Sequence, residues 1–148
     1  RSTLFPYTTL FRSASGEKVT MYIEFNGNPC GKSTGDCVIR AISVVENMSW
    51  RKVYLSLCVE GYDECTVGDD NKTWDKYLKS LGYRRFNLPD VKSYKLSDFA
   101  NSHKQGSYIV GTGTHAVAVV NGDIIDSWDS SGDTPLYYYA KTSDGGDS

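Results

Sequence analysis

The spacing of apolar residues in the first half of the chain is typical of amphipathic helices. In DCVIRAISVV, which starts at Asp36, apolar residues recur three and four positions apart and so share one helical face. The runs SWRKVYLSLCVEG and NKTWDKYLKSLG repeat this pattern, with Ser49 as a candidate N-cap and Gly82 as a C-terminal stop. A short helix is predicted over LSDFANSH, with Ser97 as its cap. Four aromatic residues of these helices are expected in the core: Trp50, Tyr54, Trp74 and Tyr77.

After Gly106 the pattern becomes that of strands, in SYIVGT, HAVAVV, DIIDSW and PLYYYAK, as it also is earlier in TMYIEF. Asn121-Gly122 lies between two of these runs and predicts a two-residue hairpin turn, because both residues tolerate positive φ. In that register Val120 opposes Asp123 and Val117 opposes Asp126. Helices followed by antiparallel strands predict an α+β fold, with N-terminal helices packed on a C-terminal antiparallel β-sheet.

The two ends of the chain are expected to lie outside the domain. Thr3–Ser13 match, without exception, one translation frame of a widely used short-read sequencing adapter. Residues 1–13 are therefore interpreted as an assembly artefact, which indicates a metagenomic origin and makes Met21 the expected start. Residues 21–142 suit a single domain, and 143–148 are expected to form a flexible tail.

Composition and charge exclude several classes of function. Without Arg1 and Arg12, 14 basic residues stand against 18 acidic ones, a formal charge of about −4, and no basic run indicates a nucleic-acid partner. The longest apolar run is shorter than a membrane span, and no native secretion signal is seen, so a cytoplasmic location is expected. The sequence does not determine the oligomeric state.

The four cysteines are expected to be reduced thiols. Cys30 and Cys37, like Cys58 and Cys65, have six residues between them, whereas structural zinc sites favour gaps of two to four. No metal and no cofactor is therefore predicted. Cys58 is expected to be a small buried residue on the face of the second predicted helix.

The stretch FNGNPCGKSTGDCVIRAIS could hold either a phosphate-binding loop or a reactive cysteine. A phosphate loop needs four residues between its glycines and a helix directly after the lysine. Gly27 and Gly31 have only three residues between them, Asn26 holds the first glycine position, and the helix starts late. The second half instead places Cys37 in the first turn of a helix capped by Asp36 or Thr34, where the helix dipole favours a thiolate.

A thiolate nucleophile needs a base, and the chain has two histidines. His103 ends a polar helix and is expected to be solvated. His115 opens a strand after GTGT, and the hairpin register makes Asp126 its diagonal neighbour, where a carboxylate would orient the imidazole. A bulged three-residue loop would bring Asp129 to His115 instead. Trp128 is expected to shield this site and to form one wall of a pocket.

The order of these residues resembles that of papain-like enzymes. GDCVIRAIS, SYIVGTGTH and THAVAVVNGDIIDSWDSS are similar to a family of small papain-like cysteine peptidases of gut bacteria and phages, and more distantly to bacteriocin-leader-processing peptidases. The resemblance implies a nucleophile at Cys37, a base at His115 and an orienting acid at Asp126.

The resemblance further implies a peptidase or amidase that acts on peptides or proteins through a thioester. Papain-type enzymes usually place an oxyanion-hole glutamine at the position of Gly31, so Asn28 or Asn26 is the expected substitute donor. Two alternatives stay open. The same nucleophile could pass the acyl group to an amine or deamidate a side chain, or the chain could be a non-catalytic, phage-encoded binding module.

Overall fold

Four helices and a six-stranded sheet make up the fold of the computed structural model, which describes residues 16 and 18–142. The predictions for residues 1–13 and 143–148 lie outside these residues. The helices are α1 (Cys37–Glu46), α2 (Trp50–Asp63), α3 (Asn71–Ser80) and α4 (Leu96–Ser102). The strands are β1 (Tyr22–Glu24), β2 (Tyr83–Asn87), β3 (Ser107–Gly111), β4 (Ala116–Val120), β5 (Asp123–Asp126) and β6 (Tyr137–Lys141). The α+β class is confirmed.

The sheet has the order β1-β5-β4-β3-β6-β2 and is mostly antiparallel. The predicted hairpin is confirmed: Val120 pairs with Asp123, and Asn121 and Gly122 have φ of 50° and 81°. The sheet is mostly antiparallel, as predicted, but two strands from outside the C-terminal part of the chain form its edges. β1 pairs in parallel with β5, and β2, which lies between α3 and α4 in the chain, adds an unpredicted strand against β6. The polar sequence YRRFN of β2 hid it, because an edge strand needs little apolar surface.

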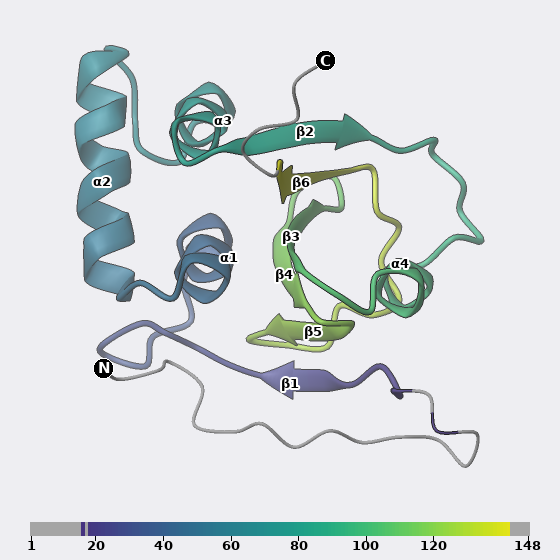
Figure 1. Ribbon diagram of the computed structural model, residues 1–148. Helices are drawn as coiled ribbons and strands as arrows, with labels where there is room; N and C mark the ends of the chain where they lie inside the picture. Colours follow the sequence, from purple (N-terminus) through teal and green to yellow (C-terminus); the bar gives the residue numbers. More distant parts are fainter. Residues whose placement is uncertain (1–15, 17, 143–148) are drawn as a thin grey trace.

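Helices cover both faces of the sheet, with α1, α2 and α3 on one face and α4 on the other (Figure 1). Alternate residues of β4 serve the two cores. Ala116 and Ala118 belong to the cluster with α1, while Val117 and Val119 belong to the cluster with α4. This two-sided burial explains why HAVAVV is a continuous apolar run.

One predicted helix cap is confirmed, and two other details of the helices differ from the predictions. Ser49 caps α2 as expected, by accepting a hydrogen bond from the Lys52 N–H. Ser97 is not a cap, because α4 already begins at Leu96 and Asp98 instead accepts a 2.8 Å hydrogen bond from the Lys95 N–H. Tyr54, expected in the core, is 44% exposed.

Contacts to the domain begin before Met21. Lys18 forms an ion pair of 2.7 Å with Asp123, and the Thr20 hydroxyl donates to Asn101 at 2.7 Å. None of the helices in the described part of the chain is long and apolar enough to cross a membrane.

Candidate active site

The first residue of α1 meets the sheet at the end where β4 begins and β5 finishes. Antiparallel pairing places His115, just before β4, and Asp126, the last residue of β5, at this same end. Because α1 packs across β4, its N-terminal residue Cys37 arrives there as well. The structure thus brings together the three residues that the sequence selected from three separate segments.

The Cys37 thiol is partly buried and lies close enough to His115 and to the Ala116 N–H for both to lower its pKa. Burial alone would raise the pKa of the Cys37 thiol. The hydrogen bonds from His115 and from the Ala116 N–H, together with the positive charges of His115 and Arg40, outweigh burial and hold the pKa below its ordinary value. The position at the start of α1 acts in the same direction, because the first-turn N–H groups lack helical acceptors. The site therefore favours a thiolate.

The His115 ring bridges Cys37 and Asp126. Its Nε2–H donates to Asp126 Oδ2 at 2.6 Å, which leaves Nδ1 as the nitrogen that faces the thiol. Burial alone would lower the pKa of His115. The hydrogen bonds and charges of Asp126 and Cys37 outweigh burial and raise this pKa to about 9. A lowered thiol pKa beside a raised imidazole pKa favours a thiolate–imidazolium pair at neutral pH.

Asp126 is buried and held by several donors besides His115. The Ser130 hydroxyl donates to Oδ2 and the Ser127 N–H donates to Oδ1, both at 2.8 Å. These bonds hold the carboxylate in place beside the imidazole. Sequence reasoning did not single out Ser130. Its side chain is fully buried in the structure.

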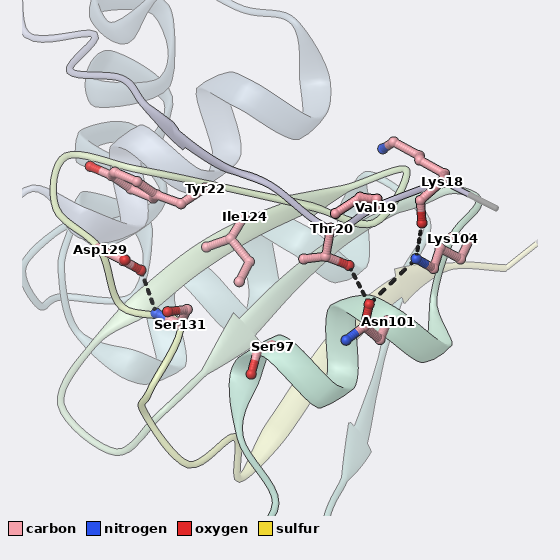
Figure 2. A pocket seen from close by; sticks show the side chains of 10 residues that line it. All are labelled: Lys18, Val19, Thr20, Tyr22, Ser97, Asn101, Lys104, Ile124, Asp129 and Ser131. Carbon is pink, nitrogen blue, oxygen red and sulfur yellow. Dashed lines mark hydrogen bonds between the residues drawn. The ribbon is translucent and has the colours of Figure 1, made fainter. Parts of the chain in front are cut away.

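Asp129, the alternative acid, lies away from His115. It lines a pocket of about 500 Å³ between the segment before β1 and α4, where it accepts a 3.0 Å hydrogen bond from the Ser131 N–H (Figure 2). In the same pocket Lys104 is already bound to the Lys18 carbonyl and to Asn101. None of the three residues Cys37, His115 and Asp126 lines this pocket.

A smaller pocket, about 300 Å³, adjoins the imidazole. His115 and Trp128 line it together with threonines 112, 114 and 134. The two rings lie 4.9 Å apart between centroids and are tilted by 34°. Trp128 thus covers one side of the His115 ring and forms a wall of this pocket, while its own outer face is exposed.

A buried arginine, not identified from the sequence, lies beneath the site. Arg40 forms ion pairs with Asp36 and, at 3.5 Å, with Asp126 Oδ1. The other Asp36 oxygen accepts a 2.7 Å hydrogen bond from the Trp50 indole. The expectation that the Asp36 carboxylate caps α1 is therefore wrong, because this side chain makes no cap hydrogen bond. The sequence feature that could have indicated this ion pair is the four-residue spacing of Asp36 and Arg40, which favours an ion pair on a helix.

Replacement of Arg40 by methionine is expected to lower the free energy of unfolding by about 3–5 kcal/mol, because the buried carboxylates of Asp36 and Asp126 would lose their countercharge. Urea unfolding at pH 7 measures this loss. Lys72→Met, at an exposed site on α3, is the control and should change stability by less than about 0.5 kcal/mol. Equal effects of the two substitutions would contradict a structural role for the Arg40 charge.

The asparagine side chains of the loop before α1 make hydrogen bonds within this loop. The Asn26 amide nitrogen donates to the Lys32 carbonyl at 3.0 Å, and the Asn26 side-chain oxygen accepts from the Asn28 N–H. The Asn28 side-chain oxygen accepts from the Cys30 N–H at 2.9 Å. Of the two candidate oxyanion donors, only Asn28 keeps its amide nitrogen out of these loop contacts.

The remaining thiols and the second histidine lie elsewhere. Cys30, Cys58 and Cys65 are exposed, so the expectation that Cys58 is buried is wrong. His103 is not simply solvated either. Its ring stacks on Phe99 at 3.8 Å between centroids, and its Nδ1 contacts the Phe99 carbonyl. Among residues 16 and 18–142, no three His, Cys, Asp or Glu side chains form a group that could hold a metal ion.

A scan against protein-family models, a search of curated proteins and a search of solved structures each found no match to this chain.

Proposed function

We propose that this protein is a papain-like cysteine hydrolase, most simply a peptidase or amidase acting on peptides or proteins. The observation that supports this most directly is the 2.6 Å hydrogen bond between His115 and Asp126, with the Cys37 thiol near enough to the same imidazole for its pKa to be lowered. A nucleophile, a base and a group that orients the base are the three parts that covalent acyl transfer requires.

In the proposed reaction, the Cys37 thiolate attacks the substrate carbonyl carbon. The tetrahedral intermediate collapses when the His115 imidazolium gives its proton to the leaving nitrogen, so that the C–N bond breaks and a thioester remains. His115, now neutral, accepts a proton from water as that water attacks the thioester. The C–S bond then breaks, which releases the carboxylic acid and restores the ion pair.

The developing oxyanion needs donors that are already in place. The backbone N–H of Cys37 is one candidate, because it lies in the first turn of α1 and has no helical acceptor. The Asn28 amide nitrogen is the second. The pocket beside His115 and Trp128 suits the leaving group, which must come within reach of the imidazole.

Selective alkylation tests the proposed nucleophile. At about pH 6, iodoacetamide should modify Cys37 well before the exposed thiols of Cys30, Cys58 and Cys65, as followed by peptide mass spectrometry over time. His115→Ala is the control, since it should remove the advantage of Cys37 and leave the other three rates unchanged. Slow labelling of all four thiols at similar rates would instead favour a binding module.

A reactive Cys37 would then be assayed on a peptide library with and without a primary amine. Release of the free acid in both conditions supports a hydrolase. Formation of an amide adduct as the main product would identify an acyl transferase that uses the same three residues.

The proposed mechanism also sets the pH dependence of turnover. The imidazolium must donate a proton, and the pKa of His115 is raised to about 9, so kcat/KM should fall as pH rises above about 9. The thiol pKa is lowered, so the acid limb should lie below the ordinary titration of cysteine. A profile from pH 4 to 10 measures both limbs. Activity that first appears above pH 9 would contradict a preformed ion pair.

A further inference from the structure

The outward face of α2 carries an apolar stripe that the fold leaves uncovered. It consists of Leu55, Cys58, Val59 and Tyr62, which we call the outer stripe. Val59 is 61% and Tyr62 is 83% exposed, whereas the opposite face of the helix buries Val53 and Leu57. In Figure 1, α2 lies at the outer edge of the molecule, with α1 and α3 on its inner side. Contiguous exposed apolar surface is typical of sites that bind another protein.

Charges at the two ends of the outer stripe are of opposite sign. Lys52 lies in the first turn of α2 and Asp63 is its last residue. They are about three helical turns apart, so they lie on the same edge of the stripe. Both are exposed, and within the described part of the chain neither side chain has an ion-pair partner.

We propose that the outer stripe binds a second copy of this chain, with the two α2 helices antiparallel about a two-fold axis. Such an axis carries each residue to the opposite end of the partner helix on the same edge. Lys52 of each copy then lies beside Asp63 of the other, and the apolar side chains meet between the two ion pairs. Lys52 and Asp63 are thus complementary to each other across the two-fold axis in this orientation.

Other arrangements leave charges unmatched. A parallel pair would place Lys52 beside Lys52 and Asp63 beside Asp63. A uniformly acidic or basic surface would repel one end of the stripe. A single helix pair is smaller than the roughly 1,000 Å² typical of stable interfaces, so we expect a dissociation constant of about 10–100 µM.

The dimer is tested by sedimentation velocity on the full chain over a concentration series that spans this range. The mass should rise from one chain to two. Val59→Asp should abolish the dimer, because a charge would enter its apolar centre. Lys52→Asp and Asp63→Lys should each weaken self-association about tenfold, since like charges would then meet in both pairs.

Mixing the two charge variants gives the sharpest result. In the mixed dimer both edge pairs again join a carboxylate to an ammonium group, so a heterodimer should form at least as tightly as the original homodimer. A chain that stays monomeric at every concentration would overturn the proposal. So would a dimer that survives Val59→Asp, or charge variants that do not restore association on mixing.

Cys58 offers an independent check, because it lies near the middle of α2 and therefore close to the two-fold axis. Copper(II) phenanthroline, which takes two electrons from two thiols with release of two protons, should join two copies through a Cys58 disulfide. Cys58→Ser should remove this cross-link and Cys65→Ser should keep it. A cross-link that depends on Cys65 alone would contradict the antiparallel register.

Discussion

Replacement of Cys37 by alanine is expected to lower kcat for peptide hydrolysis by about 10⁶-fold, the order found when a covalent nucleophile is removed. No other thiol can substitute, because Cys30, Cys58 and Cys65 are exposed and none of them contacts a histidine in the described residues. The loss is measured by product release from the best library peptide, at saturating substrate.

The matched control is Cys58→Ala, which removes an exposed thiol from α2 and should leave turnover within about twofold. Circular dichroism and the thermal midpoint of Cys37→Ala should stay close to those of the original protein, because the thiol is small and only partly buried. Turnover that survives Cys37→Ala in a folded protein would end the proposal of covalent catalysis.

Replacement of Asp126 by asparagine is expected to lower kcat by about 10⁴-fold, the order seen when the acid of such a triad loses its charge. The carboxylate holds Nε2 of His115 at 2.6 Å and raises its pKa. Without that charge the imidazolium is less stable, and the thiolate that depends on it becomes rarer at neutral pH. Two measurements follow: the turnover and the rate of Cys37 alkylation at about pH 6 should both fall.

Asp129→Asn is the control that separates the two aspartates. Its carboxylate lines another pocket and accepts a hydrogen bond from Ser131, so turnover should change by less than about threefold. Equal losses for the two substitutions would mean that Asp126 has no special role. Because Arg40 keeps its ion pair with Asp36 in Asp126→Asn, the variant should still fold.

The candidate site was largely predictable because local rules determine where its residues lie. Asn121-Gly122 fixes the hairpin register, and the register places Asp126 beside His115. The first turn of α1 then supplies Cys37. The hairpin pattern does not contain the packing of α1 across β4, which brings Cys37 to His115.

Features that depend on long-range packing were missed. The pairing of Arg40 with Asp126 joins α1 to β5, and a sequence pattern shows only its local half, the spacing from Asp36. The β2 strand was overlooked because its partner β6 lies at the far end of the chain. Tyr54 and Cys58 were assigned to the core because apolar residues occur on both faces of α2.

The placement of the thiol and its base in distant parts of the chain has a consequence during synthesis. Cys37 leaves the ribosome before β4 and β5, which bring His115 and Asp126. Until the last strands dock, the sulfur lacks the partners that ionise it. On the proposed mechanism, the thiol would therefore become reactive only after these strands have folded against α1.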